Sequence, residues 1–125
     1  MKHVAIQFGK SLDQDAFEQT KKLLSPDCIY LIGQDTLTGP EAICQSYEQN
    51  MLDGRKKLDV LEWGQSRIED IDNRTFYVHF TDYLTHQNQK YTHRCKQKLT
   101  LNDQAQIIRI EHIHDAEEQD RLDAF

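Results

Sequence analysis

The chain has 125 residues, of which 38% are apolar and 29% charged, and this predicts one globular domain over residues 1–125 with a single hydrophobic core. The formal net charge of -6 argues against nucleic acid as a partner, because phosphate binding needs clustered Lys and Arg. No apolar run approaches the length of a membrane span or a signal peptide, so we expect no membrane partner and a cytoplasmic location.

The first third of the sequence predicts a helix followed by a small hairpin. Apolar residues recur at helical spacing over residues 12–24, and Ser11 with Gln14 has the pattern of a capping box. Residues 28–33 form a short apolar run, which predicts a strand that turns back into residues 36–38.

A second helix and a meander of strands are predicted for the rest. Gly39-Pro40-Glu41 favours a helix start, and the helix should end near Gly54. After Lys57 apolar and polar residues alternate, which predicts four antiparallel strands over residues 58–71, 75–86, 90–101 and 106–114. Helices that precede one curled antiparallel sheet make an α+β fold. The tail from Asp115 forms either a short helix or a frayed acidic end.

Matching residues across the strands predicts which side chains face the interior. A turn between Gln87 and Lys90 places Asp82 opposite Cys95, and the last pair of strands matches best with Gln97 opposite His112. A slip of that last pair by one residue would bury Arg109 and Glu111, which is costly. The predicted register gathers a polar cluster at one end of an apolar concave face: Asp82, His93, Cys95, Gln97, His112 and His114, covered by Trp63 unless a bulge at Gly64 turns it away.

The segment TLTGPEAICQSYEQ, residues 36–49, is similar to the G-x-x-x-I-x-x-x-Y/F helix start of the nuclear transport factor 2-like superfamily. With the order of elements, the chain resembles its SnoaL-like polyketide cyclase and ketosteroid isomerase-like branches over almost the whole length. The resemblance implies a cone-shaped curved antiparallel sheet wrapped around N-terminal helices and enclosing a pocket. It also implies a homodimer formed through the outer sheet face, with no metal or other cofactor.

The resemblance also suggests roles for particular residues. Cyclase relatives use an acid on the last strand for proton transfer. The matching position here is His112, a departure from the family's aspartate that leaves proton transfer possible. The ketosteroid isomerase pattern calls for a tyrosine and a protonated acid as oxyanion donors. Tyr30 or Tyr47 and Asp82 are candidates by residue type alone.

His112 and His114 point to the same side of their strand because they are two residues apart. Three interpretations are open for this pair. The two histidines bind a metal together with His93 or Asp82, or they belong to a catalytic or ligand-binding polar cluster, or they are structural. We favour the polar cluster. Cys95 beside His114 has the pattern of a nucleophilic dyad, but no helix N-terminus or oxyanion hole is identifiable near it, so we place it among the substrate-binding residues.

Asp82 is the candidate acid or base, because apolar neighbours raise the pKa of a carboxyl group. The alternative for Asp82 is a salt bridge with Arg94. We predict an isomerase, cyclase or hydrolase that acts on a small, mainly apolar molecule by proton exchange with Asp82 and His112. The alternative is a non-catalytic ligand-binding or dimerisation domain. The predicted substrate-binding residues are Tyr30, Tyr47, Trp63, His93, Cys95, Gln97 and His114.

Overall fold

Four helices and one curved sheet make up the chain, and the computed structural model describes all residues from Met1 to Phe125. The helices are α1 (Lys2–Asp13), α2 (Phe17–Leu23), α3 (Pro40–Lys57) and α4 (Ala116–Ala124). The strands are β1 (Leu24–Ile32), β2 (Asp35–Thr38), β3 (Val60–Trp63), β4 (Arg67–Asp70), β5 (Thr75–His86), β6 (Gln89–Leu101) and β7 (Ile107–Ile113). None of the helices is long and apolar enough to cross a membrane.

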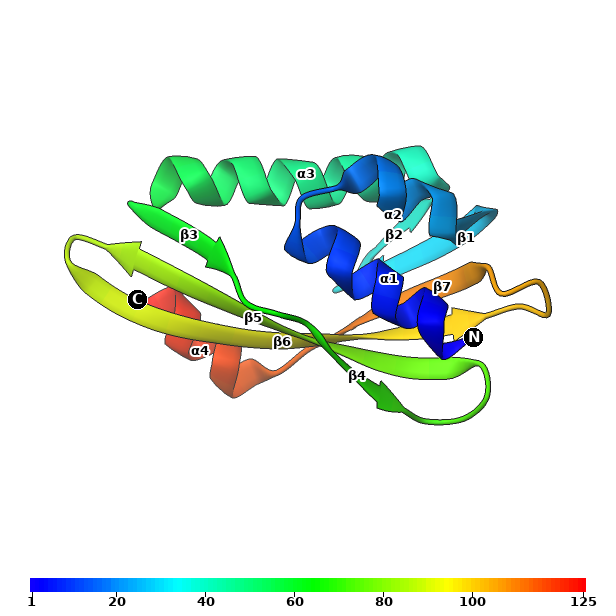
Figure 1. The fold of residues 1–125 in the computed structure, drawn as a ribbon. Coiled ribbons are helices and arrows are strands. Elements are labelled where there is room, and N and C mark those ends of the chain that lie inside the picture. The colour runs from blue at the N-terminus through cyan, green and yellow to red at the C-terminus, as the bar shows by residue number, and fades with distance from the viewer.

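The sheet has seven strands in the order β2-β1-β7-β6-β5-β3, with β4 also paired to β5. It is strongly curved and unclosed, with α1 and α3 on one side, whereas α4 lies beside β6 (Figure 1). The predicted α+β class and curved sheet are therefore confirmed. One pairing differs from the others, because β1 runs parallel to β7 whereas the other strand pairs are antiparallel.

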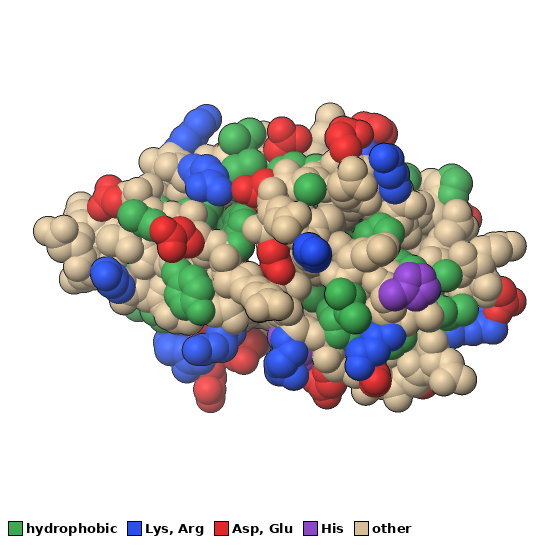
Figure 2. All heavy atoms as spheres, viewed as in Figure 1, with side chains coloured by type: hydrophobic (Ala, Val, Ile, Leu, Met, Phe, Trp, Pro, Cys, Tyr) green, Lys and Arg blue, Asp and Glu red, His purple; other side chains and the backbone are tan.

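On the face drawn in Figure 2, acidic and basic side chains are interspersed.

The predicted inward faces of β5 and β6 are correct, but the register between them is not. Asp82 pairs with His93 instead of Cys95. The turn is formed by Gln87 and Asn88, whose φ angles of 51° and 66° suit a two-residue hairpin loop between His86 and Gln89. The strands are therefore shifted by two residues, which preserves the side that each residue faces.

The register of β6 with β7 was predicted better. Gln97 lies opposite His112, as expected, and Leu99 lies opposite Ile110. An irregularity near Thr100 then places Leu101 opposite Ile107 instead of Ile108. A bulge of this kind adds one residue to one strand, which simple alternation does not reveal.

The helix predicted over residues 12–24 is correct only in part. The chain instead forms α1 before it and α2 within it, and the break contains Asp15 at a φ of 54°. Ser11 is not a helix cap, because it lies inside α1, where its hydroxyl donates to the Phe8 carbonyl at 2.7 Å and lies 2.6 Å from the Thr20 hydroxyl. The predicted strand over residues 58–71 is also two strands, β3 and β4, separated near Gly64.

The core lies between α1, α3 and the concave side of the sheet. Phe8 of α1 and Ile43 of α3 are fully buried, as are Leu99 of β6 and Ile110 of β7. Each such side chain contributes about 1.5–3 kcal/mol by leaving water. The tail is helical, because the Asp115 side chain accepts a hydrogen bond from the Glu118 amide at 3.1 Å and so caps α4.

Candidate active site

An open cavity of about 400 Å³ lies on the concave side of the sheet and is lined mostly by apolar side chains. These side chains include Leu12 of α1, Leu61 of β3 and Leu122 of α4. Leu58, just before β3, also lines the cavity. Every predicted site residue except one lines this cavity. The residues brought together are Tyr30, Tyr47, Trp63, Asp82, His93, Cys95, Gln97 and His112.

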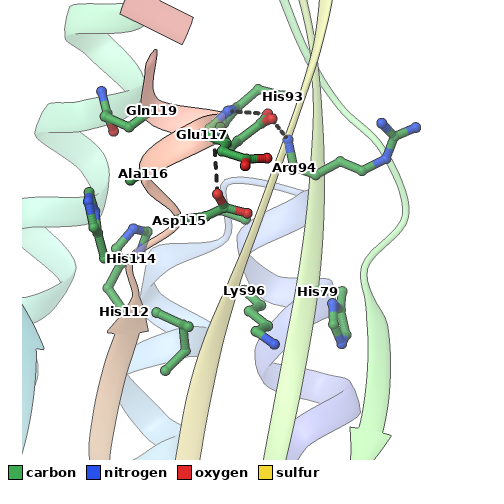
Figure 3. Close-up of a pocket in the computed structure, with 13 residues that line it drawn as sticks. His79, His93, Arg94, Lys96, His112, His114, Asp115, Ala116, Glu117 and Gln119 are labelled. Carbon is green, nitrogen blue, oxygen red and sulfur yellow. Dashed lines mark hydrogen bonds and ion pairs between the residues drawn. The ribbon is translucent and has the colours of Figure 1, made fainter. Parts of the chain in front are cut away.

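His114 is the exception. It is exposed and lines a second depression next to the start of α4, which shares His93, Cys95 and His112 with the cavity. Arg94 and Lys96 belong to the same depression, and Figure 3 shows these residues around α4 and the neighbouring strands. β7 ends at Ile113, so His114 no longer follows the alternation of the strand. The structure therefore separates His114 from the cavity.

Asp82 is the acid of the cavity. It lies opposite His93 on β6 and opposite Trp63 on β3, and its carboxylate makes no hydrogen bond in the structure. Burial, with a smaller contribution from the negative charge of Asp13, raises the pKa of Asp82 from 3.8 to about 7. The predicted alternative, a salt bridge with Arg94, is absent. Asp82 is therefore able to change protonation state near neutral pH.

His112 lines the wall of the cavity formed by β7. Burial, together with His114 and His93, lowers the pKa of His112, so the neutral imidazole is favoured at pH 7. Its Nδ1 atom is buried and has no hydrogen-bond partner. Since β6 separates β5 from β7, His112 and Asp82 occupy different parts of the cavity wall, and no hydrogen bond joins them.

A hydrogen-bonded trio closes another part of the wall. The Tyr47 hydroxyl donates to Gln97 Oε1 at 2.7 Å, and Gln97 Nε2 donates to the Tyr30 hydroxyl at 3.1 Å. The two rings stack with centroids 5.2 Å apart. Burial raises the pKa of Tyr30 to about 12 and that of Tyr47 well above its usual value. Both hydroxyls therefore keep their protons at pH 7, and that of Tyr47 is donated to Gln97.

Three potential metal-binding atoms do come close together, but they are not the predicted set. One ligand atom each from Asp82, His93 and Cys95 lie within 4.8 Å of one another. His112 and His114, the pair that suggested a metal from the sequence, are not among them. Burial, with a smaller effect of Asp82, raises the pKa of Cys95 to about 12, so the group contains a neutral thiol. We treat the group as a polar cluster of the cavity.

Two carboxylates that contact residues of the cavity wall were missed from the sequence. Asp15 accepts a hydrogen bond from Trp63 Nε1 at 2.7 Å and forms an ion pair with Arg55 at 3.0 Å. The hydrogen bond fixes the indole in the cavity wall. Glu118 of α4 is only 8% exposed and accepts a hydrogen bond from His93 Nδ1 at 2.9 Å. The sequence offered a signal only for Glu118, as the third residue after the Asp115 cap.

No family model matches the chain, and no curated protein matches its sequence. Solved structures are similar over nearly the whole chain. A candidate polyketide cyclase from Xanthomonas campestris pv. campestris is 12% identical, with a TM-score of 0.73, and the match covers 94% of this chain and 92% of that one. A nuclear transport factor 2-like protein from Burkholderia pseudomallei is 12% identical, with a TM-score of 0.72 and coverages of 97% and 95%.

An epoxide hydrolase from M. tuberculosis, described as LEH-like, is 14% identical, with a TM-score of 0.65 and coverages of 95% and 85%. At such identities a likeness shows the fold and leaves the chemistry to the site. The chain has the nuclear transport factor 2-like fold, shared with SnoaL-like and polyketide cyclase-like proteins.

Proposed function

We propose that this protein is an enzyme that moves protons on a small, mainly apolar molecule carrying a carbonyl or an epoxide, as an isomerase, cyclase or hydrolase does. The observation that carries the proposal is Asp82, a carboxyl group with a pKa of about 7 in a mostly apolar cavity. Near neutral pH such a group is present in both its acid and its base form, which suits general acid/base catalysis.

The second proton-transfer group is His112. It lies on β7, which borders β6 on one edge, whereas Asp82 lies on β5 at the other edge. Its lowered pKa keeps the ring neutral, so it can accept a proton while Asp82 gives one, or the reverse. A substrate placed between them exchanges protons at two different atoms. For a carbonyl compound, a proton leaves the carbon next to the carbonyl and another is returned elsewhere on the molecule. For an epoxide, the acid protonates the ring oxygen and the base takes a proton from the attacking water.

Tyr30 is the candidate oxyanion donor. Its hydroxyl oxygen accepts from Gln97, and its own proton has no assigned acceptor, so it is free for a substrate oxygen. Tyr47 is committed to Gln97 as a donor and therefore holds the trio in place. Trp63, His93 and Cys95 complete the wall against which the substrate packs.

The proposal extends to a homodimer formed through the outer sheet face. This face carries Tyr77, with the Lys96 ammonium 4.5 Å above its ring, and the hydrogen-bonded pair of His79 and Glu69 at 2.7 Å. A mass measurement by light scattering during size-exclusion chromatography tests the dimer. A monomeric mass at micromolar concentration would exclude it.

Proton transfer is testable without knowing the natural substrate. We expect the protein to accelerate exchange of hydrogen for deuterium next to the carbonyl of apolar cyclic ketones in D2O, or the hydrolysis of styrene oxide, both followed by NMR. Asp82→Asn and His112→Ala should each lower the rate by about 100-fold, the size of one general acid/base contribution. If a probe turns over and neither variant changes its rate, the assignment of these two residues is wrong.

The non-catalytic alternative makes a different prediction for the same probes. A simple binding domain should bind a ketone with little pH dependence between pH 5 and 8 and should turn none of them over. A proton-transfer site should bind it with a pH dependence that Asp82→Asn removes, because the carboxyl group titrates within this range.

A further inference from the structure

We propose that Glu118 of the C-terminal helix is a positioning residue that holds His93 with its hydrogen on Nδ1, so that Nε2 of His93 acts as a proton acceptor in the cavity beside Asp82. This assigns His93 a role in proton transfer and makes α4 a required part of the site. The catalytic consequence rests on the proposed function, whereas the state of the His93 ring does not.

Glu118 is a buried acid surrounded by donors. Its Oε1 atom accepts from the Tyr91 hydroxyl at 2.8 Å, from His93 Nδ1 at 2.9 Å and from the Arg94 backbone amide at 2.9 Å. Its Oε2 atom accepts from Arg121 Nη2 at 2.8 Å and from Arg121 Nε at 3.1 Å. Burial alone would raise the pKa of Glu118, but these donors outweigh it and lower the pKa to about 2.

An ionised carboxylate can only accept hydrogen bonds, so the hydrogen between Glu118 and His93 must sit on Nδ1. Nε2 of a neutral His93 is then left with a lone pair. The negative charge of Glu118 also stabilises the imidazolium that forms when Nε2 takes up a proton. The contact therefore sets which nitrogen of His93 is free to accept a proton.

The His93 ring lies close to the cavity acid Asp82. A ring nitrogen of His93, a carboxylate oxygen of Asp82 and the Cys95 sulfur lie within 4.8 Å of one another. The other titratable groups that face the ring are His112, Tyr91 and Arg121, the last two through Glu118. One proton shared between Asp82 and His93 gives either a neutral pair or an ion pair. The pair can therefore take a proton from a substrate or give one to it.

The same helix covers the cavity. Pairing of β6 with β7 begins only at Lys96, and α4 lies against the stretch of β6 before it (Figure 1). Leu122 of α4 lines the cavity, and Phe125 stacks on Tyr91 with ring centroids 5.4 Å apart. Helix α4 thus both lines this end of the cavity and supplies the acceptor for His93.

The direct test is NMR of the histidine ring nitrogens in 15N-labelled protein at pH 7 without any ligand. The His93 signals are assigned by their loss in His93→Gln. We expect Nδ1 to carry the hydrogen and Nε2 to be unprotonated. A hydrogen on Nε2 of neutral His93 in the unmodified protein would overturn the proposal, and this measurement needs no variant of Glu118 to fold.

Two variants separate positioning from simple anchoring of the helix. Glu118→Ala should let the His93 hydrogen exchange between Nδ1 and Nε2, whereas Glu118→Gln, which keeps an acceptor oxygen, should keep the hydrogen on Nδ1. Glu117→Ala on the exposed side of the same helix is the control and should change neither. If Glu118→Ala loosens α4 but leaves the His93 signals as they were, Glu118 only anchors the helix and the proposal is wrong.

A kinetic test addresses the catalytic part. With any ketone or epoxide probe that depends on Asp82, Glu118→Gln should lower kcat by about tenfold or more, change KM little and shift the acid limb of the pH profile. An unchanged pH profile would overturn the catalytic role of His93. If no probe turns over at all, the proposed function fails, while the NMR result still decides the state of the ring.

Discussion

Asp82 of β5 and His93 of β6 lie directly opposite each other across an antiparallel strand pair, and both line the cavity. His93 is hydrogen-bonded on its Nδ1 side to Glu118, whereas the Asp82 carboxylate has no hydrogen-bond partner. An unpaired carboxyl group in such a place is more stable protonated than ionised. The folded protein therefore carries a cost at high pH that the unfolded chain does not.

The first prediction is that Asp82→Asn stabilises the protein at high pH. The folded protein holds the Asp82 proton up to about pH 7, whereas the unfolded chain releases it near 3.8. Folded protein binds more protons between these values, so its stability falls as pH rises through this window. Asparagine does not titrate, so the stability of Asp82→Asn does not fall for this reason. Urea unfolding should show it more stable by about 2 to 4 kcal/mol at pH 8, with the difference shrinking toward pH 4.

Asp120→Asn is the control for this experiment, because Asp120 is exposed on α4 and makes no hydrogen bond or ion pair. It should leave the pH dependence unchanged. A difference between Asp82→Asn and the unmodified protein that does not vary with pH would show that folding does not change the pKa of Asp82.

The second prediction concerns coupling through Gln97. Gln97 is 5% exposed and joins the hydroxyls of Tyr47 and Tyr30. Gln97→Leu leaves the Tyr47 hydroxyl without its acceptor, and Tyr47→Phe leaves Gln97 Oε1 without its donor, so each should cost about 1–3 kcal/mol. The double variant should cost less than the sum by about 1 kcal/mol or more in urea unfolding. Additive costs would mean that the trio does not act as a unit.

The third prediction is that none of the three thiols behaves as a nucleophile in the folded protein. Burial is the main cause that raises the pKa of Cys28 to about 12, that of Cys44 to about 11 and that of Cys95 to about 12. Alkylation by iodoacetamide at pH 7.5 should be slower by about 100-fold or more than in urea, followed by mass spectrometry. Rapid labelling of Cys95 alone in the folded protein would revive the nucleophilic dyad suggested by the sequence.

The fourth prediction tests how closely α1 approaches the sheet. A side chain at Gly9 would overlap the Ser66 hydroxyl and lie 3.1 Å from Val78 Cγ1. Gly9→Ala should therefore destabilise the protein by about 1–3 kcal/mol, although alanine is the better helix former. Thermal unfolding of Gly9→Ala with Ser66→Gly should recover part of the loss. No recovery would place the clash elsewhere.

The face that each strand residue turns to the cavity was predictable, whereas the exact neighbours were not. Period-two alternation placed Asp82, Gln97 and His112 on one side, and a shift of two residues along β6 preserves that side while exchanging Cys95 for His93 as the partner of Asp82. Local composition does not measure such a shift. His114 was placed wrongly in the cavity because β7 ends one residue before it.

Contacts between distant segments were beyond the reach of sequence patterns. Asp15 reaches Trp63, and Glu118 reaches His93, over separations in sequence that no local motif spans. The N-terminal helix was missed although its buried residues Val4, Ala5 and Phe8 are spaced as on one face of a helix, so the local pattern did carry a signal for it.

The last prediction uses Trp63, the only tryptophan of the chain, as a reporter of the cavity. It lies opposite Asp82 on the neighbouring strand, and its indole donates to Asp15 at 2.7 Å. Ionisation of Asp82 places a new charge in the wall of the cavity beside the ring. Trp63 fluorescence should therefore change with a midpoint near pH 7 in the unmodified protein.

Two variants decide which group the fluorescence reports. Asp82→Asn should abolish the transition near pH 7 while leaving the emission maximum in place. Asp15→Ala should release the indole and shift the emission toward that of an exposed tryptophan at every pH, with the transition retained. If the midpoint persists in Asp82→Asn, Asp82 is not the group that titrates near pH 7, and the proposed proton exchange at Asp82 is wrong.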